Sequence, residues 1–457
     1  MKNLSQVLEE VLKKVKPSEE EYNELNRIAA EVIDRVKLSV KRRELDVHVI
    51  LIGSAARNTW VAGDRDIDIF IGFDPSIPMN DLERYGIDIG KEVAGGSYVI
   101  QYAEHPYVKA KINDFVFDIV PYYKVEAASL SISAVDRTPF HQRFVTANIN
   151  GREDQVRLLK QFLKGIGIYG AELKIKGFSG YLCELLIIKY ESFLQLLKDV
   201  TSWKSGKFIS VLGEETSTDF GSPLIVVDPV DPKRNVAAAV SSESFFNFID
   251  SAREFLLKPC IEFFFPKQIG AICAEDLRDI LSKRGTKIYA LCFKMLELVE
   301  DIAYPQLEKS VKSICKALSR AGFQPLRTDI YFDKGNAALL LELIIWNLPP
   351  LCKHIGPPVE CKEHARKFKD RYLNDTSVFS GPFIQNNRYI VEIPRKCLSV
   401  DAFLERELKN VKLGRAVYRS MKNGCEVLCD EEILKIDSRE YRVFLAKYFN
   451  KVQLRCK

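Results

Sequence analysis

Residues 50–70 read ILIGSAARNTWVAGDRDIDIF and place two aspartates, Asp66 and Asp68, inside a segment that is otherwise largely apolar. Side chains alternate between the two faces of a β-strand, so residues two apart point the same way. We therefore expect both carboxylates on one face of a strand. The intervening Ile67 and the following Ile69 then face a hydrophobic core.

A third aspartate, Asp118, follows the same rule in the apolar run FVFDIVPYY, where Phe117 and Ile119 take the core face. If its strand neighbours the first one, three carboxylates converge. At an effective dielectric constant near 20, two such charges repel by roughly 4 kcal/mol. Raised pKa values can relieve this repulsion. Divalent cations relieve it better, and Mg²⁺ favours one or two carboxylates together with substrate phosphates.

The bend before these aspartates suits a phosphate group. A strand over 47–53 ends at Gly53 and Ser54, and a short helix is predicted to follow. Backbone N–H groups and a hydroxyl at such a bend can bind a phosphate, and Arg57 can add charge-assisted hydrogen bonds. Metal-binding carboxylates opposite a phosphate site favour two-metal chemistry, and nucleotidyl transfer is the reaction that fits.

An isolated Asp-x-Asp pair usually lies on a solvated strand edge, so the surrounding pattern matters. A helix over 18–40 begins with a capping box at Ser18, and a helix from Asp81 to Glu92 has Asn80 as its expected N-cap. Strands are predicted over 67–73 and 98–104. A hairpin turns at Asn113 and Asp114. The first 125 residues therefore predict a small α/β unit.

Three domains are expected in this chain of 457 residues. They are a catalytic head over 1–145, a mostly helical central neck over 146–265, and α+β modules over 266–457. One C-terminal module could be inserted within another. The predicted fold class is α+β and multidomain.

Composition indicates a protein of the cytoplasm. The formal net charge of +5 permits an anionic partner, and neither a membrane span nor a secretory signal is found. Eleven scattered cysteines predict reduced thiols. Cys352, His354, Cys361 and His364 could in principle bind zinc, but the first spacing is unusually short, and we interpret them as part of a loop and helix junction.

The combination of bend, paired aspartates and later aspartate resembles the nucleotidyltransferase superfamily that includes DNA polymerase β, poly(A) polymerases and tRNA-tailing enzymes. The resemblance narrows in successive blocks such as GSAARNTW, AEHPYV, DIVPYYK, SAVDRTPFH and VVDPVDPKRNVAAAVS, which are similar to those of archaeal, class I CCA-adding enzymes. It is dense over the first 240 residues and thinner afterwards. It implies template-independent addition of C, C and A to tRNA 3′ ends from CTP and ATP, with release of pyrophosphate.

The resemblance also implies roles for individual residues. Asp66, Asp68 and Asp118 are the expected catalytic residues and Mg²⁺ ligands, and Asp118 is the one best placed to help deprotonate the tRNA 3′-hydroxyl. The expected nucleotide-binding residues are Gly53, Ser54, Arg57, His141, Lys160, Tyr169 and Arg234. Glu104 and His105 are expected near the primer end. Without the resemblance, Lys160 would be read as a solvated helix residue, and Tyr169 and His141 as structural.

The remainder of the chain is expected to bind the tRNA acceptor stem and T arm, and relatives suggest a homodimer. Basic residues mix with aromatic ones over 362–374 and 408–422, as a phosphate-binding surface requires, although such helices are more often only solvated. Two alternatives stay open. One is a poly(A) polymerase-like tailing enzyme, and the other is a non-catalytic RNA-binding protein.

Overall fold

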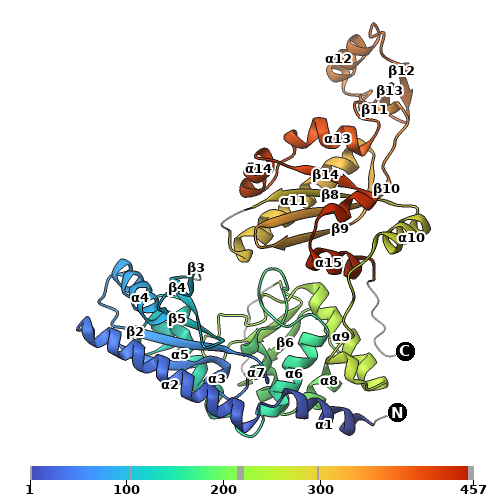
Figure 1. Cartoon of the computed structure of the whole chain (residues 1–457). Coiled ribbons are helices and arrows are strands. Elements are labelled where there is room, and N and C mark those ends of the chain that lie inside the picture. Colours follow the sequence, from blue (N-terminus) through green and yellow to red (C-terminus); the bar gives the residue numbers. More distant parts are fainter. Residues whose placement is uncertain (1–2, 103, 214–220, 296–297, 451–457) are drawn as a thin grey trace. The chain divides into compact units, whose positions relative to one another are not determined.

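The computed structural model describes residues 3–102, 104–213, 221–295 and 298–450, which form two compact units (Figure 1). Among the described residues, those up to 267 belong to the first unit and those from 268 onwards belong to the second. No helix in the described ranges has both the length and the apolar character that crossing a membrane requires. Ala103, in the strand predicted over 98–104, lies outside the described residues.

A five-stranded sheet organises the first part of the first unit, with the strand order β1-β2-β5-β4-β3. In that order the strands are His48–Ile52, Asp66–Phe73, Phe115–Tyr123, Pro106–Ile112 and Tyr98–Tyr102. Only β2 and β5 run parallel; the other neighbours are antiparallel. The helices α2 (Glu19–Arg42) and α4 (Met79–Ala94) share one hydrophobic core with this sheet.

Local sequence signals explain most of these boundaries. Ser18 and Glu21 form the predicted capping box of α2. Helix α4 ends at Gly95, whose φ of 69° is in the left-handed region. The prediction that Asn80 caps α4 was wrong. The helix starts at Met79 after Pro78, which has no side-chain hydrogen bond to offer and instead fixes the backbone at the helix entrance.

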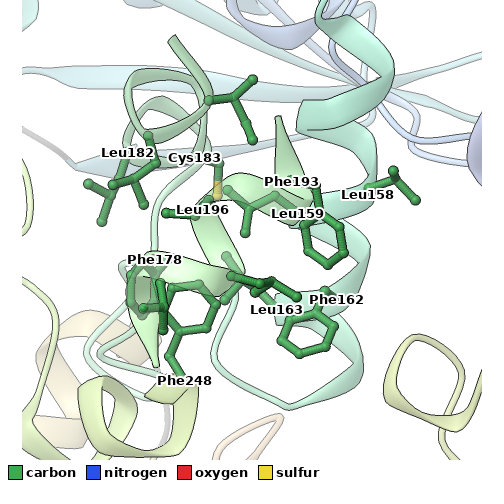
Figure 2. Close-up of a cluster of buried hydrophobic side chains, with 14 of the residues drawn as sticks. Leu158, Leu159, Phe162, Leu163, Phe178, Leu182, Cys183, Phe193, Leu196 and Phe248 are labelled. Carbon is green, nitrogen blue, oxygen red and sulfur yellow. The ribbon is translucent and has the colours of Figure 1, made fainter. Parts of the chain in front are cut away.

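The rest of the first unit is mainly helical. Its helices are α5 (Thr138–Asn148), α6 (Glu153–Gly165), α7 (Gly180–Tyr190), α8 (Phe193–Val200) and α9 (Ser242–Leu257). The parallel pair β6 (Lys207–Ser210) and β7 (Leu224–Val227) lies between α8 and α9 in the chain, and α1 (Leu4–Val15) packs against α6. Figure 2 shows the core of this part, where Phe162, Phe193 and Phe248 lie among leucines.

A four-stranded antiparallel sheet organises the second unit, in the order β14-β8-β10-β9. These strands are Glu426–Cys429, Lys287–Lys294, Asn336–Ile345 and Gln324–Asp333. Helix α11 (Glu300–Ala321) contributes to one of its cores. Helices α10 (Ala274–Arg284) and α15 (Arg439–Phe449) contribute to the other. Strand β10 lies in the middle of this sheet, and its residues 337–343 are buried because helices cover both faces.

A second, smaller sheet is nested within this one in the chain. Its strands β11 (Leu351–Pro358), β13 (Arg388–Pro394) and β12 (Ser380–Gln385), with α12 (Lys362–Tyr372), all fall between β10 and β14. The segments that enter and leave it lie side by side: Asn347 forms a bridge with Ser399, and Arg395 N–H donates to the Pro350 carbonyl at 2.6 Å. Helices α13 (Val400–Glu407) and α14 (Arg415–Lys422) then lead back to the host sheet.

The cysteines largely follow the expectation of reduced thiols. Nine of those described are free. Cys260 is a correction, because it is disulfide-bonded, and singly scattered cysteines give no sequence signal of pairing. Cys352 and His354 lie on β11 and Cys361 precedes α12, and no three His, Cys, Asp or Glu side chains in the described residues are placed to hold a metal.

Candidate active site

The two central strands of the first sheet bring aspartates together. Asp68 on β2 lies directly opposite Asp118 on β5 in the parallel register, and Asp66 lies two residues before Asp68. The intervening Ile67 and the Ile119 that follows Asp118 are buried in the core shared with α2 and α4. The predicted alternation is therefore confirmed, and the carboxylates project from the sheet face away from those helices.

This crowding changes how readily the carboxyl groups ionise. Burial, then the charge of Asp118, raises the pKa of Asp68 to about 6, with Asp66 adding to the rise and Arg57 opposing it. Burial also raises the pKa of Asp118, and Lys109 opposes that rise. The Nζ of Lys109 lies 3.5 Å from Oδ1 of Asp118. The positive charges of Arg57 and Lys109 are therefore too weak to keep the pKa values of Asp68 and Asp118 at their ordinary level.

The bend after β1 lies against Asp68. Gly53 has a φ of +78°, and a Cβ built on it would lie 2.0 Å from Oδ2 of Asp68. Only glycine leaves room for that carboxylate next to the backbone. Ser54 follows at the start of the four-residue helix α3 (Gly53–Ala56) and is partly buried. The predicted juxtaposition of bend and aspartate is present.

Arg57 is held from two helices. Its Nε donates to Oε1 of Glu184 on α7 at 3.0 Å, and its Nη1 donates to Oε1 of Gln142 on α5 at 2.8 Å. The side chain is only 8% exposed. The structure therefore fixes this guanidinium near the aspartates, where its charge opposes the rise in the pKa of Asp68.

Lys160 and Tyr169 meet above the first turn of α7. A Cβ built on Gly180 would lie 3.3 Å from the Tyr169 hydroxyl and 3.8 Å from Nζ of Lys160. Lys160 is 2% exposed, and its ammonium donates to the Thr59 carbonyl at 2.9 Å. Burial lowers the pKa of Lys160 and raises that of Tyr169. The interpretation of Lys160 as a solvated helix residue, which ignored the family resemblance, was wrong.

His141 and Arg234 converge on a buried carboxylate, Asp228. Their Nε2 and Nη1 atoms lie 2.9 and 2.8 Å from its Oδ2. Tyr181 donates to Oδ1 at 3.0 Å and stacks on His141, with ring centroids 4.4 Å apart. Burial favours the neutral acid, but these hydrogen bonds and one from Val230 N–H outweigh it and lower the pKa of Asp228 to about 2. Arg234 keeps an exposed side chain at this cluster.

Glu104 and His105 differ in what they can reach. Glu104 accepts a hydrogen bond from the Ala134 N–H and lines a cavity of about 550 Å³, together with Arg137 and Lys233. His105 is 4% exposed, and neither ring nitrogen has a hydrogen-bond partner. Only Glu104 of this pair therefore faces a space that a substrate could enter.

Comparison with known proteins places this site in a family. Three family models match in succession: a nucleotidyltransferase domain over residues 33–141, the second domain of tRNA nucleotidyltransferase over 154–265, and the C-terminal domain of CCA-adding enzyme over 284–430. The CCA-adding enzyme of Methanosarcina mazei is 43% identical over 441 residues, which cover 96% of this chain and 97% of the relative. The chain belongs to the archaeal CCA-adding enzyme family.

A second CCA-adding enzyme, from Methanosarcina acetivorans, is 42% identical with the same coverage. Similarity to solved structures is weaker: one Cid1 poly(U) polymerase aligns with 56% of this chain and 95% of that chain, at 14% identity and a TM-score of 0.45. The nucleotidyltransferase model over residues 33–141 contains all five strands of the first sheet, which is therefore the nucleotidyltransferase head of a CCA-adding enzyme.

Nucleotidyltransferases of this kind use divalent metal ions, and the carboxylate cluster fits such an ion. Oδ1 of Asp118 is buried with only a long contact of 3.5 Å to Nζ of Lys109, and burial and then the charge of Asp118 shift Asp68 towards its neutral form. A divalent cation would satisfy both groups. As the side chains stand, however, no three acidic, His or Cys groups among the described residues form a complete ligand set.

Sequence reasoning missed the two buried carboxylates that organise this CCA-adding enzyme site, Glu184 and Asp228. Both are 0% exposed. Each had a weak signal: Glu184 interrupts the apolar run of α7, and Asp228 directly follows the buried strand β7. A charged residue that must be buried needs partners, and distant segments supply all the hydrogen-bond partners of Glu184 described above but only some of those of Asp228.

Proposed function

We propose that this chain adds C, C and A to the 3′ end of tRNA without a template, using CTP and ATP and releasing pyrophosphate. The family supports this activity over nearly the whole chain. The observation that carries the chemistry is Asp68 lying directly opposite Asp118 on β5, beside the bend at Gly53. Nucleotidyl transfer needs a metal site and a triphosphate site in contact, and this is the one place in the described head where the predicted parts of both meet.

Asp66, Asp68 and Asp118 are the proposed ligands of Mg²⁺. When bound, the metal lowers the barrier by neutralising charge on the triphosphate and making the attacking oxygen more acidic. The carboxylate of Asp118 is the proposed acceptor for the proton of the tRNA 3′-hydroxyl. The Asp68 carboxylate, held against Gly53, orients the triphosphate side of the site.

The proposed nucleotide site is built from both parts of the first unit. Ser54, Arg57 and Lys160 bind phosphates, for which a fixed guanidinium and an ammonium are suited. Tyr169 lies beside Lys160 and contributes its hydroxyl. His141 and Arg234 contact the base or ribose from the Asp228 cluster. Nζ of Lys160 contacts the carbonyl and the hydroxyl of Thr59, and because an ammonium has three N–H donors, one is left for a phosphate.

The remaining proposals concern the macromolecular substrate. Domains over 1–145, 146–265 and 266–457 act as head, neck and tRNA-binding modules. Glu104 lines the cavity through which the primer end approaches. His105 is buried, so its proposed role is indirect, as the residue next to Glu104 in the chain. The C-terminal modules bind the acceptor stem and T arm by backbone contacts, as RNA duplexes require. The protein acts as a homodimer in the cytoplasm, where its tRNA substrate is used.

An extension assay tests the activity. A tRNA lacking its CCA end is incubated with Mg²⁺ and with CTP, ATP or both, and the products are sequenced. We expect two C residues from CTP alone, and a complete CCA end that stops there with both nucleotides. Unlimited addition of A from ATP alone would instead identify a tailing polymerase of the poly(A) type.

Alanine variants of the carboxylates test the roles of individual residues. We expect Asp66→Ala, Asp68→Ala and Asp118→Ala each to reduce turnover by at least about a thousandfold, because each removes metal binding, while tRNA binding persists. Asp34→Ala, at an exposed position of α2, is the matched control. Near-normal turnover in any of the three variants would refute the role assigned to that residue, and in all three it would indicate a protein that only binds RNA.

A further inference from the structure

Glu184 is a carboxylate enclosed in an apolar helix. It lies in α7, whose neighbours Cys183, Leu185 and Leu186 are all buried in the central core of the first unit. Its own side chain is 0% exposed. Burying a carboxylate is costly unless positive charge and hydrogen bonds compensate, so the position of its partners indicates what the residue does.

Those partners come from the bend segment of the head. Oε1 of Glu184 accepts a hydrogen bond from Nε of Arg57 at 3.0 Å and another from the hydroxyl of Thr59 at 2.6 Å. Oε1 of Gln142 accepts a hydrogen bond from Nη1 of Arg57. Within the described part of the chain, Nη2 of Arg57 makes no hydrogen bond. The contacts fix the plane of the guanidinium and leave one nitrogen able to donate.

The second cation of the proposed phosphate site depends on the same carboxylate. Nζ of Lys160 lies 2.9 Å from the carbonyl of Thr59 and 3.3 Å from its hydroxyl, the hydroxyl that donates to Glu184. Lys160 lies on α6, whereas Arg57 and Thr59 follow β1. A single acidic side chain therefore links the two cations, which come from segments about a hundred residues apart in the chain.

We propose that Glu184 is a positioning residue for the triphosphate of the incoming nucleotide, acting through Arg57 and, by way of Thr59, through Lys160. The proposal rests on the proposed function of this site. Glu184 touches neither substrate nor metal. It sets the direction of the guanidinium and keeps both cations close together before the substrate arrives, so that the triphosphate meets a prearranged site.

Glu184→Gln is the direct test, because it keeps the shape and removes the charge. Charge-assisted hydrogen bonds are roughly twice as strong as neutral ones, so Arg57 is held less firmly. We expect KM for CTP and for ATP to rise by about threefold to tenfold, by the same factor for both, with a smaller change in kcat. We expect equal factors because CTP and ATP carry the same triphosphate group. A lower KM would show that Glu184 competes with the substrate and would overturn the proposal.

A double-mutant cycle separates positioning from general stability. If Glu184 acts through Arg57 and Lys160, Glu184→Gln raises KM by a smaller factor in an Arg57→Ala background than in the wild type, because only the contact through Thr59 to Lys160 remains to be lost. If the two substitutions act independently, so that KM of the double variant rises by the product of the two single factors, the proposal is overturned. Glu184→Asp, which keeps the charge but shortens the side chain, is a second variant should the glutamine variant unfold. We expect it to raise KM and to leave the melting temperature nearer to that of the wild type.

Glu342→Gln is the matched control, because Glu342 is also a 0% exposed glutamate bonded to an arginine, in the second unit. We expect it to lower the melting temperature without changing KM for either nucleotide. A similar rise of KM in this variant would mean that loss of a buried charge disturbs nucleotide binding in general, and would also overturn the proposal. If the wild type adds no nucleotide at all, the proposed function fails, and binding of CTP to both Glu184 variants still reports on Glu184.

Discussion

Asp68 is a proposed catalytic residue whose burial lowers the stability of the folded protein when its carboxyl group is ionised. Its folded-state pKa of about 6 lies above the ordinary 3.8, so without metal the native state binds this proton more tightly than the unfolded chain does. Stability therefore declines as pH rises from about 4 to about 6 and stays lower above that range. We expect Asp68→Asn to raise the free energy of unfolding by about 1–3 kcal/mol at pH 8 in EDTA, with the gain vanishing below pH 4.

Urea denaturation at pH 8, 6 and 4 measures this dependence, and Mg²⁺ supplies its control. We expect the metal to stabilise the wild type more than Asp68→Asn, because the variant lacks a ligand charge. A variant that is less stable than the wild type at pH 8 would contradict the raised pKa. At the scale of residues, strand alternation predicted that Asp66, Asp68 and Asp118 share one face of the sheet. It could not predict that Glu184 and Asp228 are buried, because their burial depends on contacts with distant segments.

At the scale of elements, the junction between β1 and α3 must hold both a backbone bend and a carboxylate. A Cβ at Gly53 meets two penalties, the left-handed φ of +78° and the contact with Asp68. Gly63→Ala meets only the first, since its φ is +82° and nothing lies within 4 Å of its Cβ position. We expect each variant to lose about 1 kcal/mol of stability from backbone strain. Only Gly53→Ala should also lose kcat, by at least about tenfold.

Melting curves and single-turnover rates check this pair. Equal kcat in the two variants would show that the position of the Asp68 carboxylate does not depend on the bend. Element prediction succeeded where local signals were strong, as in the capping box at Ser18 and the turn at Asn113 and Asp114, whose φ values are 49° and 63°. It was wrong at Asn80, because a proline two residues earlier set the start of α4.

At the scale of the whole molecule, binding of tRNA should depend on salt far more than binding of CTP does. Helix α14 presents Arg415, Arg419 and Lys422, and neutralising all three to Gln should weaken tRNA binding and flatten its salt dependence by about 0.7–0.9 in the log–log slope per lost phosphate contact. Titrations at several salt concentrations measure both slopes. KM for CTP should not change.

Neutralising Arg27, Arg35 and Lys37 on α2 is the matched control, because that helix covers the sheet face opposite to the carboxylates. An equal loss of tRNA affinity in this control would show that net charge alone, and no particular surface, attracts the RNA. Patterning predicted that the C-terminal part is α+β, but not how its modules are nested, since strand periodicity does not reveal which strands share a sheet.

The way in which residues 351–394 are inserted limits how far this piece affects the stability of its host sheet. Its two connecting segments are already held together, through Asn347 with Ser399 and Arg395 with Pro350. The insertion therefore connects to the host sheet as a loop whose ends are already held together. Doubling the length of a flexible loop raises the entropic cost of closing it by only about 0.6 kcal/mol. A change in the length of the insertion is therefore expected to cost the framework around it little stability.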